Sequence, residues 1–123
     1  MNKNEKLDFF IGVAMWIGLS DGDLAQAEKV MIQRRLKKLF PYQEDLEAQI
    51  NKYEIEFKQD YSKSLKSLKK RMENSLEANM HKKNLIDFAT KIIIDDQIIN
   101  DQEELTIEEI NNFFASFSYI SKI

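Results

Sequence analysis

The chain has 123 residues, a formal net charge of −3 and no cysteine. This length suits one domain with a single core, and 43% apolar with 32% charged residues is typical of a globular protein. The lack of cysteine excludes disulfides, thiolate catalysis and Cys-based metal centres, and the single histidine, His81, excludes histidine-rich ones.

The scarcity of turn residues predicts an all-α fold. Only three glycines and one proline occur, and neither residue type follows Pro41. Architectures built from strands and tight turns need many more such positions. We therefore expect residues 1–123 to form a single compact helical bundle of about five to seven helices.

The first predicted helix is an apolar run over residues 7–19. The lysines that precede it and the small residues that follow it resemble a secretory signal sequence. However, Glu5 and Asp8 disrupt that charge pattern, and the run is too short to span a bilayer. A similar run at 85–94, where no signal could act, favours a core helix buried on most sides. We therefore expect a cytoplasmic protein without a membrane span.

A second helix is predicted over residues 26–40, ended by Pro41. The apolar positions expected to face the core are Val30, Ile32, Leu36, Leu39 and Phe40. Four cations lie near its C-terminal end, where they suit the negative end of the helix dipole: Arg34, Arg35, Lys37 and Lys38.

The middle of the chain carries apolar residues every three or four positions from Leu46 to Met80. One long helix over residues 43–80 satisfies this spacing. N-cap residues between Asp60 and Ser64 favour a break there, and hence two helices.

Positive charge concentrates in residues 58–83 and negative charge in residues 87–109. The basic segment forms either ordinary solvated helix faces or a surface for nucleic acid or anionic lipid. Glu73 and Glu77 interrupt the basic run and the overall charge is negative, so we expect no nucleic-acid partner.

Two further helices are predicted in the C-terminal third. Asn84 is the expected cap of the first, whose apolar stripe is Leu85, Phe88, Ala89, Ile92 and Ile93. The last helix starts near Asp101 or Thr106, because both positions fit a capping box. Its expected core face is Ile107, Ile110, Phe114 and Phe117. The apolar segment 113–123 either packs in the core or offers a surface to a partner.

Both apolar helices lead into an acidic turn. Asp21-Gly22-Asp23 follows the first, and Asp95-Asp96 follows the second. Glu28 follows Asp21 at the same spacing at which Glu103 follows Asp96, so aligning Asp21 with Asp96 also aligns the two glutamates. The sequence therefore predicts an internal pseudo-repeat of helix, acidic turn and helix.

Paired acidic turns point to a divalent cation, because hard cations need carboxylate oxygens that converge from different backbone segments. The candidate ligands are Asp21, Asp23, Glu28, Asp96 and Glu103, and the candidate ions are Ca²⁺, Mg²⁺, Mn²⁺ and Zn²⁺. The alternative is that these carboxylates only cap the following helices and complement their dipoles. An EF-hand is excluded, because Gly22 is misplaced and no Glu lies at the twelfth loop position.

The segment from Ser20 to Glu28 resembles the A-D-G-x-[LI]-x-x-x-E element of TerB-like tellurite-resistance domains. Those domains are all-helical, of similar length, and carry the element twice; here the second copy is residues 94–103. The resemblance implies divalent-metal binding by the five carboxylates and a cytoplasmic stress-response or scaffold role, often beside membrane complexes. Gln97 and Ile98 depart from the family's pattern and weaken the second half-site.

Three functional classes follow. The favoured one is a non-catalytic binding module that engages a cation or a protein partner through its acidic face. The second is a purely structural protein–protein interaction domain without metal. The third, a carboxylate- or metal-dependent hydrolase, is disfavoured because no nucleophile elbow, phosphate loop or histidine base accompanies the acids. We expect His81 to be exposed in a polar stretch.

Overall fold

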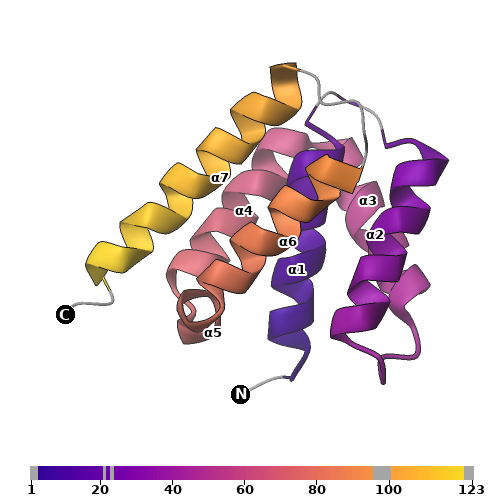
Figure 1. The fold of residues 1–123 in the computed structure, drawn as a ribbon, viewed down its shortest axis with the longest axis horizontal. Coiled ribbons are helices and arrows are strands. Elements are labelled where there is room, and N and C mark those ends of the chain that lie inside the picture. The colour runs from indigo at the N-terminus through magenta and orange to yellow at the C-terminus, as the bar shows by residue number, and fades with distance from the viewer. Residues whose placement is uncertain (1–2, 21, 23, 96–100, 121–123) are drawn as a thin grey trace.

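A computed structural model describes residues 3–20, 22, 24–95 and 101–120, with all side chains in these ranges except those of residues 3, 4, 77, 93–95, 101, 103 and 117–120. Within these ranges the chain forms seven helices and no strand (Figure 1), which confirms the all-α prediction. They are α1 (Lys3–Gly18), α2 (Gln26–Leu39), α3 (Leu46–Gln59), α4 (Tyr61–Glu73), α5 (Leu76–Met80), α6 (Lys82–Asp95) and α7 (Asp101–Ile120). None of these seven is long and apolar enough to cross a membrane.

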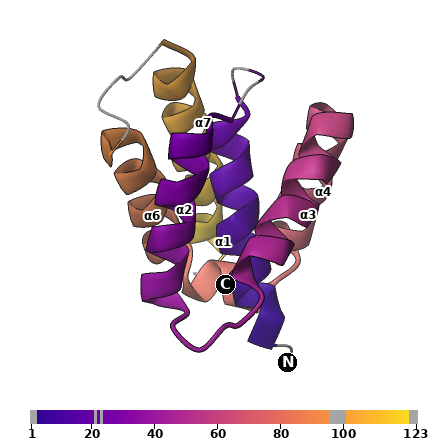
Figure 2. The same ribbon diagram turned by 90° about the vertical axis from the view of Figure 1, so that its right-hand side faces the viewer.

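Helix α1 is the centre of the bundle. Every residue from Phe9 to Leu19 is buried, so the helix is apolar on all sides and needs neighbours all round. It contacts each of the other six helices. Figure 2 shows α3 and α4 on one side of α1, with α2, α6 and α7 on the other.

The close approach of α4 to α1 depends on Gly12. A Cβ atom there would lie 2.5 Å from Leu68 Cδ1, inside van der Waals contact. One turn further along α1, the Tyr61 hydroxyl donates a hydrogen bond of 2.6 Å to the carbonyl of Trp16. The Lys69 ammonium lies 4.9 Å from the centroid of the Trp16 ring, in cation–π geometry. Packing and polar contacts together hold α4 against the central helix.

The predicted break in the middle of the chain is confirmed. Asp60 ends α3 and caps α4, because its carboxylate accepts a hydrogen bond of 3.1 Å from the backbone N–H of Lys63. The two helices pack against each other rather than forming one continuous rod.

Two apolar positions predicted to face the core, and two that only continue the apolar spacing of the middle segment, are exposed. Val30 and Leu39 are 40% and 48% exposed, because they flank a buried stripe on α2 that is centred on Ile32 and Leu36. Leu76 and Met80 are 63% and 66% exposed. They lie one turn apart on the five-residue helix α5, whose buried side is Ala78 instead.

Two predictions near α6 are also wrong. Asn84 is not the N-cap, because α6 already begins at Lys82 and Asn84 lies within its first turn. His81 is half-buried rather than exposed, and its carbonyl accepts a hydrogen bond of 2.9 Å from the N–H of Leu85.

The last helix begins at Asp101, the earlier of the two predicted starts. Ile110 and Phe114 are buried and Ile107 packs against the core, as predicted, while the side chain of Phe117 lies outside the described residues. The Phe113 ring meets Trp16 edge-on at 5.8 Å. The start of the apolar segment 113–123 therefore packs inward, and the predicted partner surface beyond it lies largely outside the described side chains.

Candidate functional site

The first acidic turn begins where α1 ends. The N–H groups of Leu19 and Ser20 bond to the carbonyls of Met15 and Ile17 at 3.0 and 3.2 Å. The chain then reverses at Gly22, whose N–H donates to the Leu19 carbonyl at 2.9 Å. Gly22 has φ of +93°, which side-chain-bearing residues rarely adopt, so the glycine of this turn has a backbone function.

Leu24 fixes this turn to the bundle. Its side chain is buried, and a Cβ added to Gly18 would lie 2.7 Å from Leu24 Cδ1. Gly18 thus leaves the space into which Leu24 packs. Leu24 therefore holds the start of the segment that leads into α2 against the end of α1.

The candidate ligands of the first turn are only partly described. Asp21 and Asp23 lie outside the described residues, whereas Glu28 is half-buried in the first turn of α2. The N-cap of α2 is Ala25, which is extended but has no side-chain acceptor for the orphan N–H groups. The N-cap side chain therefore accepts no hydrogen bond from the first N–H groups of α2. The negative charge of Glu28 in the first turn is favourable, because it lies beside the positive end of the helix dipole.

The second turn follows the same plan in its flanking helices. Helix α6 ends at Asp95 and α7 begins at Asp101, the position that falls on Gln26, the start of α2, when Asp21 is aligned with Asp96. Asp96 lies outside the described residues; Glu103 is in the first turn of α7, but its side chain is not described. The predicted repeat therefore holds for the start of the second helix in each pair.

The helix ends that flank the two predicted turns lie at one end of the bundle. Helices α1 and α6 pack against each other, and α2 and α7 each contact both of them. In Figure 1 the C-terminal ends of α1 and α6 and the N-terminal ends of α2 and α7 all lie at the upper end of the molecule. This is the arrangement that two paired turns require.

The described side chains alone do not form a metal centre. Among them, no group of three or more His, Asp or Glu residues could hold an ion. His81 lies before α6, at the opposite end of that helix from its acidic turn. Of the five predicted ligands, only the side chain of Glu28 is among those described, so the cation site stays a prediction.

A polar cavity of about 500 Å³ between α1 and α4 was not predicted. Glu5 and Asp8 line one side, and Lys70 and Arg71 line the other. The hydroxyl of Ser75 donates a hydrogen bond to the Glu5 carboxylate. Opposite charges that line one cavity attract each other, and the hydrogen bond from Ser75 to Glu5 links α1 to the segment that follows α4.

Tyr53 lies beside this cavity. Burial raises the pKa of its phenol to about 12; the Arg71 guanidinium opposes this rise and the Asp8 carboxylate adds to it. Tyr53 is therefore a neutral hydrogen-bonding group near neutral pH, and not a base. Asp8, Tyr53 and Arg71 come from three different helices, so no local sequence motif signals their meeting.

An ion cluster centred on the mostly buried Glu54 ties α2 to α3. The Glu54 carboxylate forms ion pairs with the ammonium groups of Lys29 at 2.7 Å and Lys58 at 3.0 Å. Partial burial on its own raises the pKa of Glu54, but the hydrogen bonds from Lys29 and Lys58 outweigh it and lower the pKa below its ordinary value. The charges of this cluster are explained by the link that they make between α2 and α3. The acidic turns therefore stay the candidate site.

Comparison with known proteins adds no relative. No protein-family model, no curated protein and no solved structure matches the chain.

Proposed function

We propose that this protein is a non-catalytic TerB-like helical module that binds a divalent cation where its two acidic turns meet. The observation that carries the proposal is the placement of the two helix–turn–helix units. Both turns leave α1 and α6 at one end of the bundle, and the outer helices of the two units begin at equivalent positions of the repeat, Gln26 and Asp101.

Asp21, Asp23 and Glu28 would hold the ion from the first unit, and Asp96 and Glu103 from the second. All five donors are carboxylates, which favours the hard cations Ca²⁺, Mg²⁺ and Mn²⁺ over Zn²⁺. The cation would neutralise acidic groups that otherwise repel each other and would tie the two units together. Gln97 and Ile98 make the second unit the poorer half of the site.

In this proposal the cation stabilises a surface and takes no part in a reaction. The module would then work in the cytoplasm as a stress-response or scaffold component that presents its acidic end to a protein partner. The TerB-like resemblance of residues 20–28 and 94–103 supports this role.

A purely structural interaction domain is the second candidate. One observation favours it: Glu28 and Glu103 both lie in the first turn of a helix, where a carboxylate is favourable without any metal. In that case the turns are charge-matched helix starts, and added cations leave stability unchanged.

Thermal unfolding with and without Ca²⁺, Mg²⁺, Mn²⁺ and Zn²⁺ separates the two candidates. A cation at about a hundred times its Kd stabilises the native state by about 2.7 kcal/mol, which raises Tm by several degrees. The double variant Asp21→Asn/Asp96→Asn should lose this shift. Asp45→Asn is the matched control, because Asp45 is an exposed acid before α3, at the other end of α2.

If none of the four cations moves Tm, the metal proposal fails and the structural candidate stands. It also fails if the shift survives in the double variant.

A further inference from the structure

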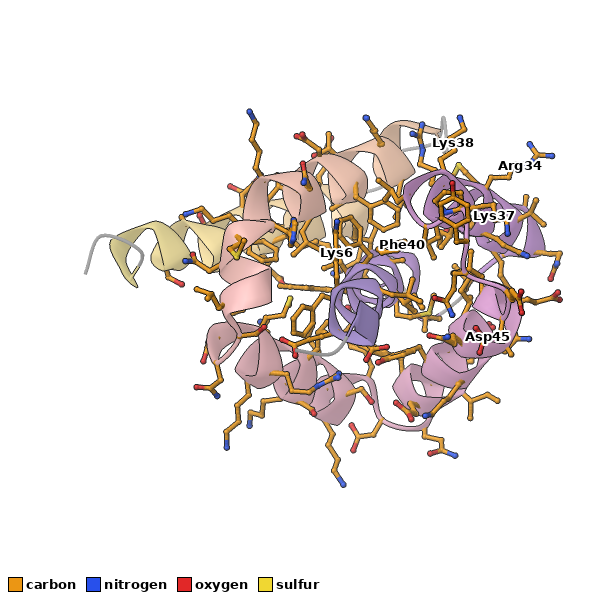
Figure 3. All side chains as sticks on the ribbon, turned by 90° about the horizontal axis from the view of Figure 1, so that it is seen from below. Lys6, Arg34, Lys37, Lys38, Phe40 and Asp45 are labelled. Atoms are coloured by element: carbon orange, nitrogen blue, oxygen red, sulfur yellow. The ribbon has the colours of Figure 1, made fainter. Side chains whose placement is uncertain are left out.

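The outer side of α2 carries a basic surface, here defined as Arg34, Arg35, Lys37 and Lys38 of α2 with Lys91 of α6. All of these except the half-buried Arg35 are exposed. Figure 3 shows Arg34, Lys37 and Lys38 along the outside of α2. This surface belongs to a protein whose net charge is −3, so the positive charge is local.

Three shallow hollows adjoin this surface. One of about 520 Å³ is lined by the four α2 cations with Met31. A second, of about 450 Å³, places Arg34 and Lys37 beside the acids Glu44 and Glu47. The third, of about 210 Å³, lies between α2 and α6 and places Lys38 and Lys91 around Leu39 and Phe88, with Asp87 the one acid in its lining. None of the three is lined by cations around a single enclosed anion site. The cations instead spread over a broad face that suits an extended anionic surface.

Apolar side chains project beside these cations. Leu39 is 48% exposed at the end of α2, and Tyr42 is 95% exposed in the turn that follows. Phe40, between them, is held inward: its ring meets Phe10 edge-on at 5.6 Å, and the Lys6 ammonium lies 5.8 Å from its centroid. The anchored Phe40 fixes the turn from which Tyr42 projects.

A second basic face, on α4, lacks this apolar component. Lys63, Lys66 and Lys70 are all exposed on it, and among the described residues of α4 no large apolar side chain is exposed. Lys69 is committed to the rings of Trp16 and Phe113. The α4 face therefore offers charge alone, whereas the basic surface on α2 offers charge with a projecting aromatic ring.

We propose that the basic surface on α2 docks the protein onto an anionic lipid bilayer. Lys and Arg are attracted to the negative potential of such a membrane, and Tyr is favoured at the boundary between headgroups and acyl chains. The exposed acids Glu104, Glu108 and Glu109 lie on α7, away from this surface (Figure 1), whereas Glu44, Glu47 and Asp87 lie at its edges. The five cations of the surface outnumber these three neighbouring acids, so the local field favours an approach of α2 toward an anionic bilayer. The docking does not require the cation site, and each can fail alone.

Sedimentation with vesicles tests this proposal in the full chain. The probes are vesicles of phosphatidylcholine alone and of phosphatidylcholine with phosphatidylserine. We expect binding only to the second kind, and weaker binding as salt is added, because ions screen the attraction.

Matched charge variants locate the contact. Arg34→Gln/Lys37→Gln/Lys38→Gln should weaken binding roughly a hundredfold, whereas Lys63→Gln/Lys66→Gln/Lys70→Gln removes the same charge from α4 and should weaken it less than about threefold. Tyr42→Ser keeps every charge and should still weaken binding several-fold. Circular dichroism verifies that each variant retains its helices.

Several results overturn the proposal: equal loss in the two triple variants, equal binding to both kinds of vesicle, or no binding to phosphatidylserine vesicles. Binding to polyglutamate without binding to vesicles also overturns it, and assigns the surface to an acidic protein.

Discussion

The two helix–turn–helix units, α1–α2 and α6–α7, have inner helices, α1 and α6, with the same burial pattern. Their outer helices, α2 and α7, differ. When Asp21 is aligned with Asp96, buried positions of α1 fall on buried positions of α6: Phe10 on Leu85, Val13 on Phe88, Ala14 on Ala89 and Ile17 on Ile92. The inner helix of each unit thus presents the same pattern to the core, and the outer helices begin at equivalent positions.

The outer helices diverge in packing and in charge. The buried residues of α2 are Ile32 and Leu36, whereas among the described side chains of α7 they are Thr106, Ile110 and Phe114. The buried stripe is therefore displaced by one position, which corresponds to a rotation of about 100° around the helix axis. Charge also inverts, since Lys29 and Arg34 fall on Glu104 and Glu109.

This difference separates what the repeat preserves from what each unit does alone. The features that the two units have in common, the burial pattern of the inner helices and the position of the turns, form the end of the bundle where the proposed cation would bind. The basic face of α2 and the acidic face of α7 belong to one unit each. A site built by both units and a surface built by one unit can therefore exist in the same small protein.

The largest expected effect tests the shared inner helices. Phe10→Ala should lower the free energy of unfolding by about 3–5 kcal/mol and Leu85→Ala by about 2–5 kcal/mol, because each leaves a cavity in the core. On the outer helices, Val30 falls on Leu105 in the same alignment, and these two side chains are 40% and 53% exposed. Their substitution by Ala should change stability by less than about 0.5 kcal/mol.

Urea unfolding measures all four variants. If Leu85→Ala is tolerated as well as Leu105→Ala, the two inner helices do not carry equivalent shares of the core.

A smaller effect tests how the first outer helix is held. Glu54→Gln breaks the ion pairs with Lys29 and Lys58, and should cost about 1–3 kcal/mol because the carboxylate is mostly buried. Glu104, the counterpart of Lys29 on α7, is exposed, so Glu104→Gln should change stability by less than about 0.5 kcal/mol.

The same cluster gives a pH dependence. The folded-state pKa of Glu54 lies below its ordinary value, so its contribution is complete above about pH 4.3 and is lost as pH falls through the folded pKa. Unfolding measured from neutral to acid pH should show the difference between wild type and Glu54→Gln shrink below about pH 4. A difference that is constant over this range would argue against the ion cluster.

The smallest effect concerns the start of α2. Ala25 has the extended backbone of an N-cap but no capping side chain. Ala25→Ser should therefore stabilise the protein by about 1 kcal/mol, measured by urea unfolding. No gain would mean that other groups already satisfy the first N–H groups of α2, as the capping interpretation of the acidic turn requires.

Local signals predicted most of the fold. The helical spacing of apolar residues and the capping residue Asp60 gave the bounds of α2 and the break before α4 to within one or two residues. The apolar spacing gave no sign that Leu76 and Met80 are exposed, because spacing does not reveal that a five-residue helix turns its small Ala78 inward.

Some features of the candidate sites could be predicted from the sequence, and others could not. The positions of the acidic turns follow from residues adjacent in sequence, so they were predictable. The meeting of Asp8, Tyr53 and Arg71 beside the cavity needs three helices to pack together. The exposed cations of α2 form a candidate surface only together with Lys91 of α6 and the exposed Tyr42. Such contacts depend on tertiary packing, which spacing along one helix does not encode.

Isothermal titration calorimetry with Ca²⁺ and Mn²⁺ tests the central claim most directly, because it counts ions per chain. A site shared by the two units predicts a single bound ion per chain, with Asp21→Asn and Asp96→Asn each weakening it strongly and Asp45→Asn leaving it unchanged. The claim is contradicted if no binding heat is found, or if Asp21→Asn removes one ion while a second, dependent on Asp96, still binds.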